Sequence, residues 1–108
     1  TLTKQSAAKA WVYFDTLTEK QFGGQLEQLC KLFGWKYYHT HNSRFSAPGY
    51  PDYTLVRERV VFAELKRQAK ASKLTAKQIE WRDALLEAKQ EWYLWRPSDM
   101  DDIAEILR

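Results

Sequence analysis

The first strong hydrophobic pattern in the chain has the spacing of a helix. Apolar side chains recur every three or four positions, at Phe22, Leu26, Leu29, Cys30 and Phe33. Thr18 and Gln21 have the spacing of a capping box, and Gly34 is a typical helix stop. We therefore expect a helix between Thr18 and Gly34 with one buried face.

Three runs with the character of strands follow this helix. The aromatic run WKYYHTH covers 35–41, and the runs YTLV and VVFAELK cover 53–56 and 60–66. β-Branched and aromatic residues favour extended structure. The segment RER between the second and third runs is short enough for a hairpin, so these two should lie side by side.

A second helix and a further strand are expected after a basic loop. Thr75 and Gln78 repeat the capping-box spacing, and the helical pattern then continues to about Gln90. The run WYLW at 92–95 predicts a short buried strand, and Pro97 should end it.

The last predicted helix has one apolar side, formed by Ile103, Ile106 and Leu107. The resulting order is αβββαβα, which indicates an α/β domain with a mixed central sheet flanked by helices. Trp81, Trp92 and Trp95 have the spacing of core residues, and we expect them to pack inside rather than to stack on bases.

Composition agrees with one ordinary globular domain spanning 1–108. Hydrophobic residues make up 44% of the 108 and charged residues 29%, and the single cysteine, Cys30, fits the core. No apolar run is long enough to span a membrane, and no signal-peptide block begins the chain. We expect a cytoplasmic protein, of a bacterial or phage-infected cell, with no membrane partner.

Charge is unevenly distributed along the chain. The formal net charge is +3, and the segment KRQAKASKLTAK at 66–77 contains five cations and no carboxylate. Such a run is often only a solvated loop, but mobile cations are also what phosphate binding requires. The candidate DNA contacts in this segment are Arg67, Lys70, Lys73 and Lys77. Further candidates lie at and after the end of the first predicted strand, namely His41, Asn42 and Arg44.

Three charged residues lie where a sheet normally carries apolar side chains. Glu64 and Lys66 are two positions apart in a predicted strand and so share a face. The hairpin would bring Asp52, at the start of its first strand, beside them. A turn aspartate and an exposed ion pair would explain them separately, whereas adjacent carboxylates favour a site for Mg²⁺ or Mn²⁺.

Two histidines raise the alternative of zinc. His39 and His41 share one face of a predicted strand, but no cysteine or third histidine is placed to complete a zinc site. We therefore expect oxygen ligands rather than a zinc pair.

At these residues the chain resembles the PD-(D/E)xK nucleases, with Pro51-Asp52 followed by Glu64-Leu65-Lys66. It looks most like their virus-type replication-repair branch, the VRR-NUC domain, over residues 18–107. The matching segments are Thr18-Glu19, His39-Thr40-His41-Asn42, Gly49-Tyr50-Pro51-Asp52, Phe62-Ala63-Glu64-Leu65-Lys66 and Leu74-Thr75-Ala76-Lys77-Gln78.

The resemblance implies a restriction-endonuclease-like fold and a role for each site residue. Asp52, Glu64 and the Leu65 carbonyl would ligate the metal, Lys66 would serve the attacking water or the phosphate, and Gln78 would add a polar contact. It also implies a glutamate on the first helix. Glu19 follows the capping threonine as in the family motif, but Glu27 lies on roughly the same side two turns later, so both stay open. Glu19 could also simply stabilise the helix N-terminus.

The expected function is that of a Mg²⁺- or Mn²⁺-dependent, structure-specific DNA endonuclease acting on branched DNA such as four-way (Holliday) junctions. A homodimer would place two sites on opposing strands, and the N-terminal extension 1–17, with its aromatic segment WVYF, is a possible interface. Two alternatives are a DNA-binding module with a degenerate nuclease site and a sequence-specific restriction-type endonuclease.

Overall fold

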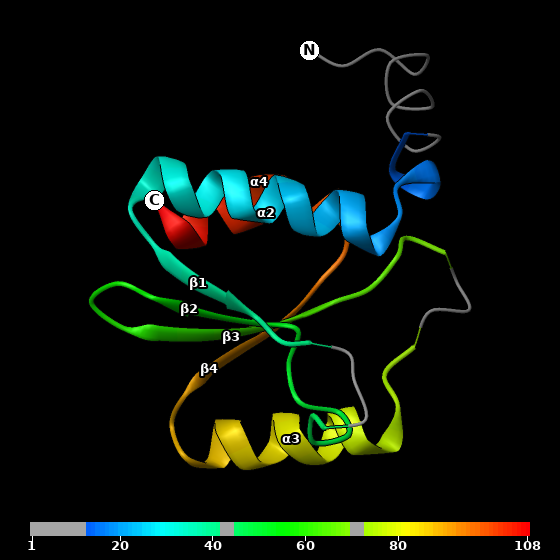
Figure 1. The fold of residues 1–108 in the computed structure, drawn as a ribbon, viewed down its shortest axis with the longest axis vertical. Helices are drawn as coiled ribbons and strands as arrows, with labels where there is room; N and C mark the ends of the chain where they lie inside the picture. The colour runs from blue at the N-terminus through cyan, green and yellow to red at the C-terminus, as the bar shows by residue number, and fades with distance from the viewer. Residues whose placement is uncertain (1–12, 42–44, 70–72) are drawn as a thin grey trace.

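The computed structural model describes residues 13–41, 45–69 and 73–108. A four-stranded sheet lies between two layers of helices. Helices α2 and α4 cover one face, and α3 covers the other (Figure 1). This is the predicted α/β architecture with a mixed sheet flanked by helices, and the predicted element order is confirmed.

The strands lie in sequence order across the sheet. They are β1 (Lys36–His39), β2 (Tyr53–Val56), β3 (Val60–Leu65) and β4 (Glu91–Trp95). The first three pair antiparallel, and β3 pairs parallel with β4. A parallel neighbour needs a crossover connection, and α3 supplies it.

Helix α2 (Glu19–Phe33) has the boundaries that its sequence signals predict. The Thr18 hydroxyl accepts from the Gln21 backbone N–H, and the Gln21 side chain accepts from the Thr18 N–H. Gly34 ends the helix in the left-handed conformation. The apolar stripe is buried at Phe22, Leu26 and Cys30.

Helix α3 (Ala76–Glu87) is shorter and less buried than predicted. It ends before Gln90, and none of its residues is fully buried. Trp81 and, on β4, Trp92 are half-buried, so the expectation that they belong to the core is wrong, whereas Trp95 is buried. The physical reason is that α3 alone covers this face of the sheet (Figure 1), so Trp81 and Trp92 stay partly in contact with water.

The C-terminal segment begins with a short 3₁₀ turn, η1 (Pro97–Asp99), before α4 (Met100–Leu107). The Asp99 carboxylate accepts from the Arg96 backbone N–H at 2.8 Å, which closes this turn. Ile103 and Leu107 are buried, as the apolar side of the predicted helix requires.

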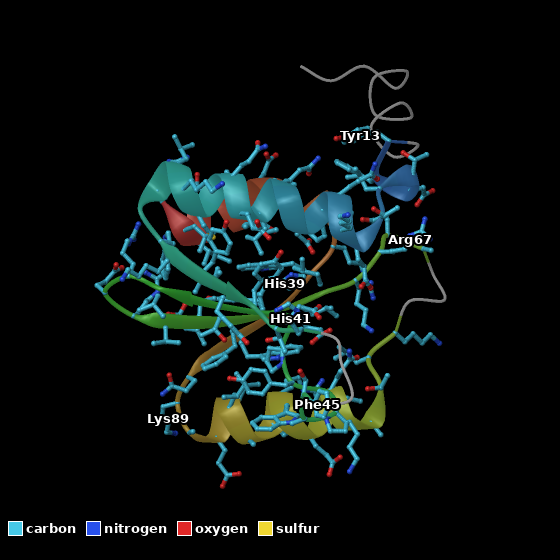
Figure 2. The ribbon with its side chains drawn as sticks, viewed as in Figure 1. Tyr13, His39, His41, Phe45, Arg67 and Lys89 are labelled. Carbon is cyan, nitrogen blue, oxygen red and sulfur yellow. The ribbon has the colours of Figure 1, made fainter. Side chains whose placement is uncertain are left out.

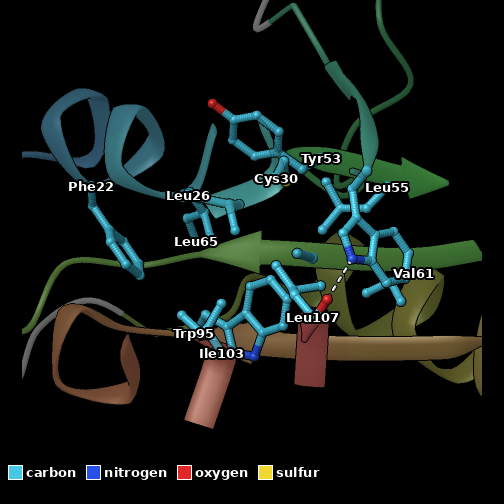
Figure 3. Close-up of a cluster of buried hydrophobic side chains, with 12 residues drawn as sticks. Phe22, Leu26, Cys30, Tyr53, Leu55, Val61, Leu65, Trp95, Ile103 and Leu107 are labelled. Atoms are coloured by element: carbon cyan, nitrogen blue, oxygen red, sulfur yellow. Dashed lines mark hydrogen bonds between the residues drawn. The ribbon is translucent and has the colours of Figure 1, made fainter. Parts of the chain in front are cut away.

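The main core lies between the sheet and the pair α2 and α4 (Figure 3). Trp35 is buried there, and its indole N–H donates to the Leu107 carbonyl at 2.7 Å. Cys30 is fully buried in this cluster, and burial raises the pKa of its thiol to about 11. The expectation of a core cysteine is confirmed.

The turn between β2 and β3 holds the ends of two helices together. The Arg57 guanidinium lies 4.6 Å from the Trp35 ring centroid and donates to the carbonyls of Phe33 and Leu107. Arg59 lies over the same ring and donates to the Ile106 carbonyl. The hairpin turn thereby ties the last turns of α2 and α4 to the sheet.

The end of the N-terminal extension packs against the domain. Leu17 is buried, and the Tyr13 hydroxyl accepts from the Gln25 side chain at 2.8 Å. Trp11 and Val12 of the aromatic segment lie outside the described residues, and the proposed dimer contact stays a prediction. Within the described ranges, no helix has the length and apolar character needed to cross a membrane.

Candidate metal-dependent hydrolytic site

The β2–β3 hairpin brings Asp52 and Glu64 together. Tyr53 pairs with Ala63, so the preceding Asp52 lies beside the following Glu64. The Asp52 carboxylate accepts from the Leu65 backbone N–H at 2.8 Å, which fixes its position at the end of β3. Lys66, the next residue, donates its backbone N–H to the Trp95 carbonyl at 3.0 Å.

Glu64 is buried, with only 2% of its surface exposed. One carboxyl oxygen, Oε1, accepts from the Gln78 side chain at 2.9 Å. The other, Oε2, is buried and has no hydrogen-bond partner in the described part of the chain. Burial raises the pKa of Glu64 well above its usual range. The Asp52 carboxylate raises it further, through its charge and by accepting a hydrogen bond from the protonated Glu64 carboxyl group, and the Lys66 ammonium opposes these effects.

Gln78 joins the site to the start of α3. Its Oε1 accepts from the Thr75 N–H at 2.9 Å as part of the capping box, while its Nε2 donates to Glu64. Because the cap uses the amide oxygen of Gln78, the amide nitrogen is the end that faces the Glu64 carboxyl group. The capping-box spacing predicted the cap, and the family resemblance implied a polar contact from Gln78 at the site, but neither specified Glu64 as its partner.

The loop before Asp52 is held against both β1 and α3. The Thr40 backbone N–H and hydroxyl donate to the carbonyls of Asp52 and Pro51, each at 2.8 Å. Gly49 adopts φ +81°, and a Cβ there would lie 2.4 Å from the Lys77 carbonyl carbon. Only glycine fits this close approach, so Gly49 positions the loop against the first turn of α3.

These residues line an open pocket of about 600 Å³. It contains most of the residues predicted for catalysis and metal binding, namely Glu19, Asp52, Glu64, Lys66 and Gln78, together with Thr40, His41 and the loop 46–50. The pocket opens at the end of β3, beside the N-terminal ends of α2 and α3.

The structure separates the two candidate glutamates of α2. Glu19 lines the pocket beside Asp52, and its pKa is raised by burial and by the Asp52 charge, with Lys66 and Arg67 opposing. Glu27 accepts a hydrogen bond from the Tyr53 hydroxyl and lines an adjoining cavity of about 540 Å³, which Glu19 and Asp52 also line but Glu64 does not. Burial and this bond raise the pKa of Tyr53. Glu19 is thus the helix glutamate that shares a pocket with Glu64.

The histidines lie at the edge of this region. His39 stacks on Tyr53 with ring centroids 4.6 Å apart and lines the adjoining cavity, whereas His41 lines both hollows. Figure 2 shows both on the side of the molecule where β1 ends.

The structure does not assemble a complete metal cluster. Among the described residues, no group of three or more His, Cys, Asp or Glu side chains is arranged to hold a metal ion. Glu19, Asp52 and Glu64 line one pocket without forming such a group. Mg²⁺ often takes only one or two carboxylates and completes its shell with water and substrate phosphate. The unpartnered Glu64 oxygen and the neighbouring Asp52 carboxylate fit that requirement.

The candidate DNA contacts are spread around the pocket. Lys73 and Lys77 are exposed, and Lys77 pairs with Glu80 at 3.2 Å. Arg67 is exposed and donates to the Asp15 carbonyl, beside the start of the described chain (Figure 2). The remaining predicted contacts, Asn42, Arg44 and Lys70, lie outside the described residues.

Comparisons with protein-family models, with curated proteins and with solved structures give no match for this chain. The geometry of the site and the sequence motif are therefore the grounds for assigning a function.

Proposed function

We propose that the protein is a Mg²⁺- or Mn²⁺-dependent DNA endonuclease of the PD-(D/E)xK superfamily, in its VRR-NUC branch. The observation that carries the proposal is the pairing of Asp52 with the buried Glu64 in a pocket that also contains Lys66. Once ionised, a buried carboxyl group beside a second carboxylate is unfavourable unless a cation compensates the two charges.

The residues that would hold the ion are Asp52, Glu64, the Leu65 carbonyl and Glu19. Their donor atoms are oxygens, which Mg²⁺ and Mn²⁺ prefer. When bound, such an ion lowers the pKa of water and offsets negative charge on a phosphoryl group.

The chain itself supplies positioning and positive charge. Lys66 orients the attacking water or stabilises the charge that grows on the phosphoryl oxygen as the P–O bond breaks. Gln78 holds the Glu64 carboxyl group through its amide N–H, so that the ionised form keeps one donor on Oε1. Asp52 is oriented by the Leu65 N–H.

The topology supports the same assignment. The order αβββαβα, with an antiparallel β1–β2–β3 meander and a parallel β4 reached through α3, agrees with the restriction-endonuclease-like core that the motif implies. Site residues in this arrangement come from the hairpin and from two helix N-termini.

The proposed substrate is branched DNA, and the proposed assembly is a homodimer. A twofold dimer would present two sites to opposing strands of a four-way junction. The N-terminal extension is the proposed contact. Sedimentation that gives only monomer, with and without junction DNA, would exclude the dimer.

The experiment that tests the function compares cleavage of a labelled four-way junction with cleavage of a matched linear duplex. Each DNA is incubated with Mg²⁺, Mn²⁺ or EDTA, using the wild type and Lys66→Ala. We expect metal-dependent, paired nicks in the junction that the variant does not make. Arg82→Ala, on the exposed side of α3, is the matched loss of one positive charge and should retain cleavage.

The other outcomes separate the alternatives. Junction binding without cleavage under any metal condition would overturn the nuclease proposal and favour a binding module with a degenerate site. Cleavage of linear duplexes at one defined sequence would favour a restriction-type endonuclease instead.

A further inference from the structure

A third hollow lies directly beside the proposed active-site pocket, between α3 and the loop 45–49. Its volume is about 390 Å³, and it is lined by Ala47, Pro48, Lys77, Glu80, Trp81 and Ala84. We call this hollow the α3 groove. None of its residues belongs to the proposed set of metal ligands.

The α3 groove is continuous with the active-site pocket. Ala47 and Pro48 line both hollows. On the helix side, Lys77 faces the groove and the next residue, Gln78, faces Glu64. A polymeric ligand bound at the proposed metal site could therefore extend directly into the α3 groove.

The position of Trp81 gives the α3 groove an aromatic wall. Trp81 is half-buried, and Tyr50 packs edge-on against it with centroids 4.8 Å apart. Tyr50 in turn contacts Phe62 on β3, so the indole is anchored to the sheet through two rings. An indole held in this way is available to a flat, apolar ligand.

The α3 groove also carries one cation suited to a phosphate. Lys77 is exposed, and among the described residues it forms an ion pair with the similarly exposed Glu80, at 3.2 Å. An ion pair of this kind contributes little, so a phosphate can replace the carboxylate as the partner of Lys77. An aromatic wall beside a cation is the combination by which proteins hold unpaired nucleotides.

We propose that the α3 groove binds an unstacked nucleobase of the DNA next to the scissile phosphate, with Trp81 against the base and Lys77 against its phosphate. This inference rests on the proposed function and makes its substrate more specific. DNA with an unpaired nucleotide at the cleavage point, as in a flap or a frayed junction, is bound better than continuous duplex.

The test uses equilibrium binding in EDTA, so that it does not depend on cleavage. Two labelled DNAs are compared: a flap carrying the fluorescent adenine analogue 2-aminopurine at its first unpaired position, and a fully paired duplex of the same sequence. Ala84→Phe fills the α3 groove from an exposed helix position. Ala88→Leu, exposed one turn further along, is the control that adds bulk outside the groove.

We expect Ala84→Phe to weaken flap binding by about tenfold, the effect of losing one stacked base, and to change duplex binding by less than about twofold. The 2-aminopurine emission should fall on binding to the wild type and to Ala88→Leu, but not to Ala84→Phe. Trp81→Leu should weaken flap binding similarly, and its thermal unfolding midpoint shows whether it is folded.

Three results would overturn the inference. One is equal weakening of both DNAs by Ala84→Phe, and another is unchanged flap binding by a folded Ala84→Phe. The third is loss of self-association in Ala84→Phe with DNA binding unaltered, which would assign the groove to a second copy of the chain. Groove-dependent flap binding without cleavage in Mg²⁺ would overturn the proposed nuclease function alone.

Discussion

Gln78 donates its side-chain amide to the buried carboxyl group of Glu64 at 2.9 Å while its carbonyl oxygen caps α3 at Thr75. One residue thus serves a helix end and the candidate site together. Forming the first turn of α3 also gives Glu64 its hydrogen-bond partner.

This double role predicts that the same substitution destabilises the protein at one capping box and has little effect at the other. Gln78→Glu retains a capping-box residue but removes the donor and places a carboxyl group against Glu64. We expect a loss of about 1–3 kcal/mol in the free energy of unfolding, measured in denaturant. Gln21→Glu makes the same change at the exposed cap of α2 and should alter stability by less than about 0.5 kcal/mol. Similar losses at both caps would contradict the role assigned to Gln78.

The environment of Glu64 predicts how stability depends on pH. Its pKa in the folded protein is raised above the ordinary 4.5, so the folded state binds the proton more tightly than the unfolded state. The contribution is present below the unfolded-state pKa and is lost as pH rises toward the folded-state value. In EDTA, the free energy of unfolding should therefore fall between about pH 5 and about pH 8, by up to about 1.4 kcal/mol per unit.

Glu64→Gln should flatten this dependence, because the amide does not titrate and can still accept from Gln78. Added Mg²⁺ at about pH 8 should raise the unfolding midpoint of the wild type and leave that of Glu64→Gln unchanged. Glu87→Gln, at an exposed position of α3, is the matched control. If the free energy of unfolding depends on pH in the same way for the wild type and for Glu64→Gln, the Glu64 carboxyl group is not the source of that dependence.

Two glycines with the same backbone conformation allow the cost of a left-handed backbone to be measured apart from the cost of a steric clash. Gly34 and Gly49 have φ of +79° and +81°, but only at Gly49 would an added Cβ meet backbone atoms, at 2.4–2.6 Å. Gly34→Ala should lose about 1 kcal/mol of stability, and Gly49→Ala should lose clearly more. Chemical denaturation measures both, and equal losses would mean that the loop tolerates displacement from α3.

The hydrogen bond from the Trp35 indole to the end of α4 is expected to contribute to stability. Trp35→Phe removes the indole N–H that the Leu107 carbonyl accepts and leaves space in a packed core. We expect a loss of about 1–3 kcal/mol in the free energy of unfolding. Tyr38→Phe, on an exposed part of β1, should change stability by less than about 0.5 kcal/mol.

Much of this architecture follows from local sequence signals. The capping boxes at Thr18 and Thr75 and the stop at Gly34 fix three helix ends within a residue. The alternation in 60–66 and the short RER turn fix a register in which Asp52 meets Glu64. These features are local, so they can be predicted without knowledge of the rest of the fold.

Features that depend on how elements pack could not be predicted in the same way. Glu19 and Glu27 share a side of α2 and both line the cavity beside Asp52, and only the docking of that helix on the sheet shows that Glu19, and not Glu27, also lines the pocket of Glu64. The contact of Gly49 with α3 joins segments that are distant in sequence. The sequence pattern around Trp81 predicts a helix, but the burial of Trp81 depends on how many helices cover the α3 face of the sheet.

The helices on the two faces of the sheet differ in how deeply they are buried, and this should affect how readily each one unfolds locally. Helix α2 contributes three fully buried large side chains to the core, whereas α3 contributes none. Amide hydrogen exchange in α3 should therefore proceed through local opening, at a free energy well below that of global unfolding, while α2 exchanges only with the whole domain. Gln78 belongs to the element that opens first, and Asp52 and Glu64 belong to the part that stays folded.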